Sequence, residues 1–209
     1  MNTLQVAQIR PATRAEGPGK RLALWTQGCS LRCHGCFNPH LWESDSSKNR
    51  PVHEVIIEIE NRLDEDPEIE GLSFLGGEPF NQAGALAELA AYFHSKSKSI
   101  VTFSGFTYNS LLTQGASHPG VSALLAHTDL LIDGPFLEAK IDEKRPWLGS
   151  TNQQYIFLTD RYSMKDVEIN QDKVEVTIAP NGEIHVNGWA PAASIEELTK
   201  AILMEMEEV

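Results

Sequence analysis

Cysteine is scarce in this sequence, and its distribution excludes most of the roles that cysteine usually plays. Only three cysteines occur among 209 residues, and all of them lie between positions 29 and 36. An odd number of cysteines in one cluster is a poor disulfide framework, and free thiols are typical of a reducing compartment. We therefore expect a cytoplasmic protein whose thiolates together bind a metal.

An excess of positive charge and long apolar runs are also missing, and we expect no signal peptide. The 17 Lys and Arg residues are outnumbered by 29 Asp and Glu residues, which gives a formal net charge of −12. This balance argues against nonspecific binding to nucleic acids and to anionic membrane surfaces. The N-terminal sequence M-N-T-L-Q-V-A-Q-I-R lacks a basic start followed by an apolar core, and no apolar run is long enough to span a bilayer. We expect neither a nucleic-acid partner nor a membrane partner.

The sequence does contain the pattern of an α/β fold in one domain, and its length suits one domain. Strands are expected at residues 4–9, 21–26, 72–75, 99–103, 129–132 and 155–158, and helices at residues 51–63, 83–95, 108–113 and 121–127. Strands that alternate with helices indicate βα units and a parallel sheet. Functional sites in such folds lie at the carboxyl ends of the strands.

The alternation of predicted strands and helices ends at about residue 160. Residues 173–178 and 183–187 alternate around A-P-N-G, which predicts a β-hairpin. Ser194-Ile195-Glu196-Glu197 has the spacing of a capping box, which predicts a helix that continues to about residue 206. We expect residues 1–160 to form the core, with the metal-binding loop at residues 27–42. Residues 161–209 are expected to be a hairpin-and-helix appendage in the same domain.

The three cysteines lie in the segment Q-G-C-S-L-R-C-H-G-C-F-N-P-H-L-W, residues 27–42. Spacings of four and three allow Cys29, Cys33 and Cys36 to point inward from one loop. An iron–sulfur cube held by three thiolates keeps one iron open to an outside ligand. Zinc is the alternative, with His34 or His40 as the fourth ligand. Because structural zinc sites usually pair two short ligand loops, this single loop favours an iron–sulfur cluster.

Glycine and polar residues follow the predicted strands. Gly76-Gly77-Glu78-Pro79 comes directly after the strand at 72–75. Its glycines allow the backbone to approach a ligand, and Glu78 can accept a charge-assisted hydrogen bond from an ammonium group. The ends of two other strands carry Thr102, Ser104 and Asp133. Lys20 and Arg21, in contrast, are expected to be solvated loop charges.

Several motifs resemble those of radical S-adenosylmethionine enzymes. C-S-L-R-C-H-G-C resembles the CxxxCxxC loop of that superfamily, and G-G-E-P resembles its second motif. A-E-G-P-G-K-R, Q-G-C and C-F-N-P-H-L-W are similar to segments of the glycyl-radical activating enzymes. T-F-S-G-F-T-Y-N-S-L, L-I-D-G-P-F and W-L-G-S-T-N-Q look most like the anaerobic ribonucleotide reductase activating proteins. These motifs follow the family order between about residues 17 and 154.

The resemblance implies an incomplete parallel (β/α) barrel of the radical S-adenosylmethionine type. Cys29, Cys33 and Cys36 would bind a [4Fe-4S] cluster, and S-adenosylmethionine would bind the fourth iron through its amino and carboxylate groups. One electron from a flavodoxin- or ferredoxin-type donor would then give a 5′-deoxyadenosyl radical. The implied target is a backbone glycine of a glycyl-radical enzyme, an anaerobic ribonucleotide reductase.

The same resemblance assigns cofactor binding to particular residues. Glu78 would bind the amino group of S-adenosylmethionine, and Asp133 would bind a cation. Gly35 stands where much of the superfamily has an aromatic residue and matches the reductase activators. The complete set of expected cofactor-binding residues is Gly35, Asn38, Gly76, Gly77, Glu78, Pro79, Thr102, Ser104 and Asp133.

Two positions depart from the family pattern, because Leu148 and Gln154 stand where the family usually has arginine. We expect these two side chains to affect either the contact with the partner or the local packing. Two alternatives to an activating enzyme stay open. One is a radical enzyme that acts on a small molecule or a peptide, similar to the deazaguanine synthases. The other is a non-enzymatic zinc or iron–sulfur module.

Overall fold

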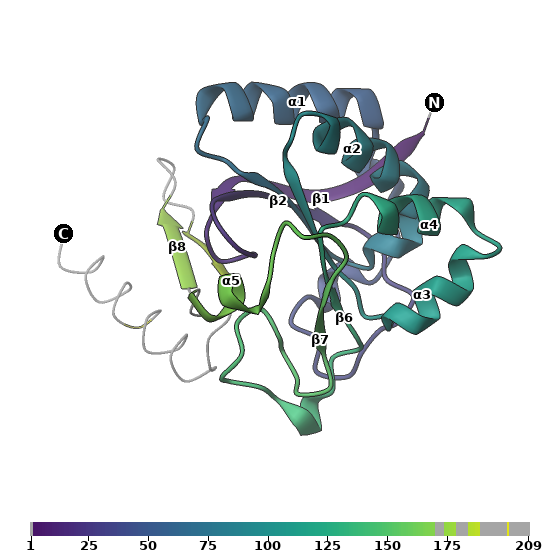
Figure 1. The fold of residues 1–209 in the computed structure, drawn as a ribbon, viewed down its shortest axis with the longest axis vertical. Helices are drawn as coiled ribbons and strands as arrows, with labels where there is room; N and C mark the ends of the chain where they lie inside the picture. Colours follow the sequence, from purple (N-terminus) through teal and green to yellow (C-terminus); the bar gives the residue numbers. More distant parts are fainter. Residues whose placement is uncertain (1, 170–173, 179–183, 189–199, 201–209) are drawn as a thin grey trace.

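The structure is a computed structural model that describes residues 2–169, 174–178, 184–188 and 200. Its centre is a seven-stranded sheet in the order β3-β1-β2-β4-β5-β6-β7 (Figure 1). The strands are β1 (Thr3–Thr13), β2 (Arg21–Thr26), β3 (Asn49–Pro51), β4 (Gly71–Gly76), β5 (Ser99–Phe103), β6 (Leu130–Asp133) and β7 (Gln154–Phe157). The six strands expected up to residue 158 are all confirmed, and β3 is an additional short strand.

The sheet is mixed. β2, β4, β5 and β6 are parallel, whereas β1, β3 and β7 run antiparallel to their neighbours. Parallel neighbours need a crossover of a dozen or more residues, and the helical connections after β2, β4 and β5 provide it. β1 and β2 are joined only by residues 14–20, which is too short for a crossover, so they pair antiparallel. The α/β class is therefore confirmed, with antiparallel strands at both sides of a parallel centre.

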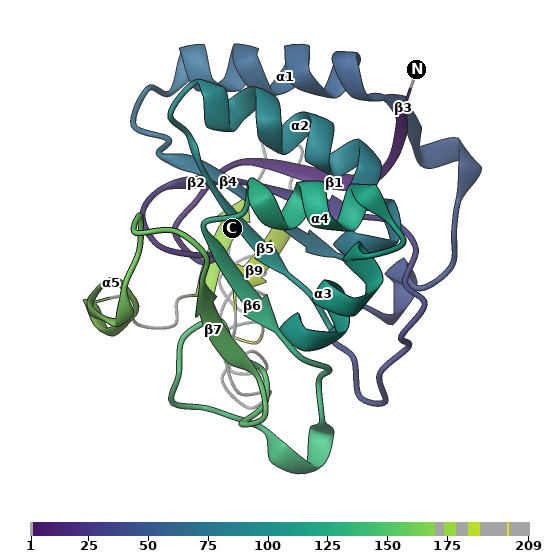
Figure 2. The same ribbon diagram turned by 45° about the vertical axis from the view of Figure 1, so that its right-hand side comes forward.

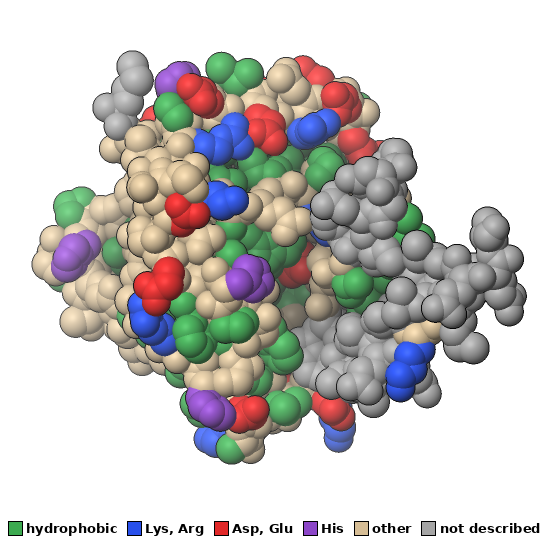
Figure 3. Space-filling model, turned by 180° about the vertical axis from the view of Figure 1, so that it is seen from behind, with side chains coloured by type: hydrophobic (Ala, Val, Ile, Leu, Met, Phe, Trp, Pro, Cys, Tyr) green, Lys and Arg blue, Asp and Glu red, His purple; other side chains and the backbone are tan. Residues whose placement is uncertain are grey.

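Four helices cover one face of this sheet (Figure 2). They are α1 (Val52–Glu65), α2 (Ala83–Ser95), α3 (Tyr108–Gly115) and α4 (Pro119–Ala126). The buried side of α1 carries Val52, Val55 and Ile59 at helical spacing, and its outer side carries the charged side chains along the top of Figure 3. The four helices expected from the sequence are confirmed to within a few residues.

The central strands are buried on both faces, which explains their continuous apolar runs. In β2, Leu22 and Leu24 belong to the core beneath the helices, whereas Ala23 and Trp25 pack on the opposite face with Leu41. Alternate residues of a strand point to opposite faces, so one strand contributes to both clusters. The face that carries Trp25 is the one that holds the candidate site.

Arg21 corrects one expectation, because its side chain is fully buried and is not a solvated loop charge. Its guanidinium donates to Ser73 Oγ at 2.8 Å, to the Leu72 carbonyl at 2.5 Å and to Tyr162 Oη at 2.8 Å. Further bonds reach Pro18 O, Ser99 Oγ and Ser99 O, each at 3.1 Å. Burial lowers the pKa of Arg21, yet arginine stays charged in proteins. The buried charge is therefore held by six hydrogen bonds.

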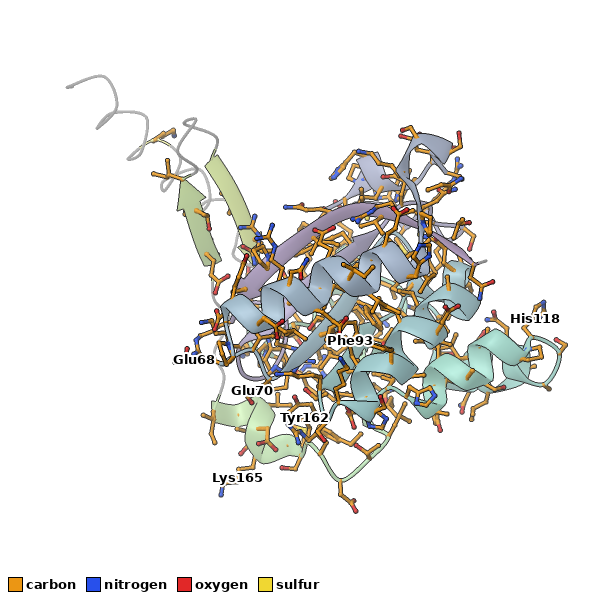
Figure 4. All side chains as sticks on the ribbon, turned by 90° about the horizontal axis from the view of Figure 1, so that it is seen from above. Glu68, Glu70, Phe93, His118, Tyr162 and Lys165 are labelled. Carbon is orange, nitrogen blue, oxygen red and sulfur yellow. The ribbon has the colours of Figure 1, made fainter. Side chains whose placement is uncertain are left out.

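The sequence did not indicate that Arg21 is buried, because one of its hydrogen-bond partners, Tyr162, lies far from it along the chain. Tyr162 lies just ahead of α5 (Met164–Ile169), a short helix that the sequence did not predict (Figure 4). Its hydroxyl also contacts Ser99 Oγ at 2.6 Å, so it joins residues from β2, β5 and the segment after β7. Lys20 behaves as expected: it is partly exposed and forms an ion pair with Asp66 at 2.6 Å.

Beyond α5, β8 (Val174–Ile178) and β9 (Ile184–Gly188) form a separate two-stranded antiparallel hairpin. This confirms the predicted hairpin, which lies on the side of the sheet opposite α3 and α4 (Figure 2). The A-P-N-G turn and the helix predicted from Ser194 lie outside the described residues. None of the helices in the described part of the chain is long and apolar enough to cross a membrane.

Candidate functional site

A cavity of about 970 Å³ lies at the carboxyl ends of β2, β4, β5 and β6. Its wall includes the cysteine loop, the turn after β4, the ends of β5 and β6, and part of the β8–β9 hairpin. Of the residues expected from the sequence, those that line the cavity are Cys29, Cys33, Cys36, Asn38, Gly76, Gly77, Glu78 and Ser104. The expected residues that do not line it are Gly35, Pro79, Thr102 and Asp133.

The cysteine loop is held at both ends by hydrogen bonds to its own backbone. Gly28 N donates to Leu41 O at 2.8 Å, and Cys29 N donates to Trp42 O at 2.9 Å. The side chain of Gln27 donates to Glu43 O at 2.7 Å. The segment between these anchors is thereby free of sheet pairing, so its side chains can converge on the cavity.

The three thiols fit a cluster with one open iron. All are free, half-buried and on the wall of one cavity. Burial raises the pKa of Cys33, and the neighbouring thiols of Cys29 and Cys36 add to this rise, as expected for sulfurs gathered in one place. Within the described residues, no three His, Cys, Asp or Glu side chains form a group that could hold a single metal ion.

The two loop histidines differ in their relation to the cavity: His40 lines its wall, whereas His34 does not. His34 is 92% exposed, and its Nδ1 lies 2.9 Å from Glu138 Oε2, so it points away from the thiols toward the loop after β6. Gly35 supports this turn, because its φ of +72° suits glycine and a Cβ would lie 3.0 Å from the Glu138 side chain. Gly35 therefore allows the backbone of the loop to adopt this conformation.

The glycines after β4 allow the Gly-Gly-Glu turn to lie directly against the cysteine loop. Gly76 has a φ of +105°, and a Cβ on Gly77 would lie only 2.2 Å from Gly28 O. Gly77 N donates to Thr26 O at 2.8 Å, and Glu78 N donates to Gly28 O at 2.9 Å. A side chain at Gly77 would force these two segments apart. The turn and the thiols are therefore parts of one site.

Glu78 is buried at the cavity wall, and three protein donors orient its carboxyl group. Oε1 accepts from Phe80 N and from Ser104 Oγ, and Oε2 accepts from Gly105 N, each at 2.9 Å. Burial raises the pKa of Glu78 to about 7, although these three hydrogen bonds act in the opposite direction. Pro79 begins the 3₁₀ helix η3 (Pro79–Gln82), and the Glu78 side chain caps this helix by accepting from Phe80 N.

Two expected residues have structural partners away from the cavity. Thr102 is fully buried, and its Oγ1 lies 2.9 Å from Thr128 Oγ1. Asp133 accepts a hydrogen bond from Tyr108 N at 2.6 Å through Oδ2 and so holds the first residue of α3. Both lie at strand ends as predicted, but the residues at a strand end alternate in direction, and only some face the cavity.

Gln5 and Gln82, which the sequence did not single out, connect the two halves of the site. Gln82 Nε2 donates to Gln27 O at 3.0 Å and to Gln5 O at 3.2 Å, and its Oε1 accepts from Gln5 N at 2.6 Å. Gln5 Oε1 in turn accepts from Ser44 Oγ and Asp45 N. These bonds join the turn after β4, strand β1 and the cysteine loop. No short motif signals them, because they link backbone groups far apart in the sequence.

The raised pKa of Glu78 has a testable consequence for stability. A carboxyl group whose pKa rises from 4.5 to about 7 on folding binds more protons in the folded state, so the free energy of unfolding falls as pH rises through this window. The full effect is on the order of 3 kcal/mol. Urea unfolding of cofactor-free protein between pH 4 and 8 should show a shallower decline for Glu78→Gln than for the wild type.

The free energy of unfolding of Glu78→Gln should still decline somewhat with pH because of Glu16. Burial raises the pKa of Glu16 to about 7 as well. Glu54→Gln, at an exposed position on α1, is the matched control and should reproduce the wild-type curve. A Glu78→Gln curve parallel to that of the wild type would contradict the assignment.

Comparison with known proteins places this site in a family. Residues 15–156 match the family described as a 4Fe-4S single cluster domain. These residues contain the cysteine loop, the Gly-Gly-Glu turn and strands β2 to β6. The class of protein is therefore that of iron–sulfur proteins with one 4Fe-4S cluster.

Relatives narrow this class further. An anaerobic ribonucleoside-triphosphate reductase-activating protein of Vibrio cholerae serotype O1 is 34% identical over 152 residues, 70% of this chain and 93% of that protein. The protein of the same name from Enterobacteria phage T4 is 26% identical over 157 residues, 73% of this chain and 94% of the relative. That of Escherichia coli K12 is 28% identical over 152 residues, 70% of this chain and 94% of the relative. The chain belongs to the family of anaerobic ribonucleoside-triphosphate reductase-activating proteins.

Proposed function

We propose that this protein is a radical S-adenosylmethionine enzyme that generates a glycyl radical on an anaerobic ribonucleotide reductase. The observation that carries the proposal is the direct packing of the Gly-Gly-Glu turn against the three-cysteine loop. Gly77 N donates to Thr26 O at the end of β2, and Glu78 N donates to Gly28 O, the carbonyl that precedes Cys29. A group that binds the open iron of a cluster on Cys29, Cys33 and Cys36 therefore lies within reach of the turn.

Glu78 is the residue that we assign to the ammonium group of S-adenosylmethionine. A carboxylate has about four acceptor positions, and three are filled by Phe80 N, Ser104 Oγ and Gly105 N. One position remains for a donor from the cavity. A bound ammonium favours the ionised carboxylate, so cofactor binding is expected to lower the raised pKa of Glu78 and to release a proton.

Cluster and cofactor together supply the chemistry that the side chains lack: one-electron reductive cleavage of the sulfonium, which provides a 5′-deoxyadenosyl radical. The chain's own residues bind and orient these groups and exclude water from the cavity. With the cluster held by Cys29, Cys33 and Cys36, that chemistry would serve to take a hydrogen atom from a backbone glycine of the partner, which would leave a glycyl radical there. The sheet ends at β7 on one side and at β3 on the other, so we assign it as an incomplete barrel that is open to a polypeptide substrate.

Anaerobic reconstitution tests this proposal. We expect about four irons per chain, reductive cleavage of S-adenosylmethionine by a strong reductant, and a glycyl-radical doublet in electron paramagnetic resonance when an anaerobic ribonucleotide reductase is added. A flavodoxin or ferredoxin is the expected donor in place of the chemical reductant.

Two outcomes would replace the proposal with an alternative function. Formation of 5′-deoxyadenosine without a radical on any reductase would indicate an enzyme that acts on a small molecule or a peptide. One tightly bound zinc ion per chain, without cofactor cleavage, would indicate a non-enzymatic module.

A further inference from the structure

The end of the cavity that lies over β1 is lined by a different set of residues from the end that carries the thiols. Arg10, Glu16 and Asn187 line it, and each side chain is more than nine-tenths buried. Arg10 pairs with Ala23 of β2, several residues before the strand end that carries the cysteine loop. Small residues separate the polar groups, since Ala7 and Ala15 also line this end. It is therefore a region of the cavity distinct from the thiols and the Gly-Gly-Glu turn.

Strand β9 closes this end, and hydrogen bonds fix it there. Asn187 Nδ2 donates to Thr13 Oγ1 at 2.9 Å, and Gly188 N donates to Glu16 Oε1 at 3.1 Å. Strand β8 adds Glu175, whose carboxylate accepts from Thr13 Oγ1 at 2.5 Å and from Arg14 N at 2.7 Å. The hairpin is thus attached to β1 and to the loop that follows it.

Part of this wall lies outside the residues that the family model matches: Arg10 and Asn187 do, whereas Glu16 lies within them. The family match covers residues 15–156, whereas β8 and β9 lie between residues 174 and 188. The cavity of about 970 Å³ is at the upper end of the range for sites that hold one small molecule. The hairpin contributes Val186, Asn187 and Gly188 to the wall of this cavity.

The polar groups at this end have bonding capacity that the protein does not use. Within the described residues Arg10 has no carboxylate at ion-pair distance, and its one hydrogen bond, to Thr177 Oγ1, is 3.3 Å long. Arg10 Nε and Asn187 Oδ1 are buried without a partner. Such groups cost free energy until a ligand or water satisfies them.

The combination of groups identifies the kind of ligand. One guanidinium beside one carboxyl group is too little positive charge for a phosphate. Among the described residues the unused groups are a guanidinium N–H of Arg10, which donates, and the amide oxygen of Asn187, which accepts. They match the C=O and N–H of a peptide group.

We propose that the hairpin end of the cavity, formed by Arg10, Glu16 and Asn187, binds a polypeptide segment of the partner through its backbone. This rests on the proposed function and adds to it a location for the segment next to the radical target. Arg10 donates to a backbone carbonyl, and Asn187 pairs with a neighbouring peptide group. The β8–β9 hairpin is then a determinant of partner specificity that the shared core lacks.

The test separates partner binding from cofactor cleavage in full-length, reconstituted protein. Arg10→Met should leave the iron content and the partner-free rate of 5′-deoxyadenosine formation unchanged. The KM for an anaerobic ribonucleotide reductase, measured by the glycyl-radical signal, should rise about 10- to 100-fold, because a charge-assisted hydrogen bond is lost. Asn187→Ala, on the hairpin, should give a smaller rise of the same kind.

Arg50→Met is the matched control, because Arg50 lies on β3 and pairs with Glu58 away from the cavity. It should keep the wild-type KM for the reductase. Wild-type KM values for both Arg10→Met and Asn187→Ala would overturn the subsite and leave the proposed function intact. Absence of a glycyl radical with the wild-type protein, despite cofactor cleavage, would instead overturn the proposed function and the subsite with it.

Discussion

Changing any one of Cys29, Cys33 or Cys36 to alanine is expected to remove the cluster and to abolish cleavage of S-adenosylmethionine. In the proposed site each thiolate supplies one of the three protein ligands, and the sequence has no other cysteine that could replace it. Iron and sulfide analysis after anaerobic reconstitution should fall from about four irons per chain to near zero. Formation of 5′-deoxyadenosine should fall to the background rate.

Ser30→Ala is the matched control in the same loop. The Ser30 hydroxyl accepts a hydrogen bond from Asn81 Nδ2 at 3.0 Å, and the side chain is exposed, so its loss should leave iron content and cleavage close to those of the wild type. If all three cysteine variants retained iron and cleavage, the assignment of the metal site would be wrong.

Arg21→Met is expected to have the largest effect on stability, with a loss of about 3 kcal/mol or more in the free energy of unfolding. The substitution removes the donors of six buried hydrogen bonds and leaves oxygens such as Leu72 O and Pro18 O without them. Because a domain of this kind is stable by only about 5–15 kcal/mol, the loss should be plain in urea unfolding of cofactor-free protein.

Two further variants define the origin of this effect. Tyr162→Phe removes one hydroxyl from the same network and should cost about 1–2 kcal/mol, and it remains measurable if Arg21→Met does not fold. Arg50→Met breaks a partly exposed ion pair with Glu58 and should cost less than about 1 kcal/mol. Equal stabilities of Arg21→Met and Arg50→Met would show that the buried network contributes nothing.

The elements of the fold were largely predictable because their signals are local. The apolar run of β2 and the helical spacing of Val52, Val55 and Ile59 each lie within one segment. The direction of each strand was harder to predict from the sequence, because it depends on connection length and on which strands become neighbours. The antiparallel pairing of β7 with β6 follows from the course of residues 134–153, which no local pattern encodes.

In the candidate site, too, some features were predictable from local sequence and others depended on the tertiary structure. The cysteine spacing and the Gly-Gly-Glu-Pro turn were visible in the sequence, and the structure brings both to one cavity. Thr102 and Asp133 were equally plausible from their places at strand ends, yet each bonds to another part of the fold. Which way a side chain faces at a strand end depends on register, and a shift of one residue reverses it.

The sequence by itself therefore determined the α/β class, the three thiolates and the family resemblance, because each rests on residue types at short, regular spacing. Only the tertiary structure decided the rest. It showed that Arg21 is a buried charge held by residues as distant as Tyr162, that Gln82 joins the cysteine loop to β1, and that β9 reaches the cavity. The hydrogen bonds that hold these groups join residues 55 to 174 positions apart, and their partners become neighbours only when the chain has folded.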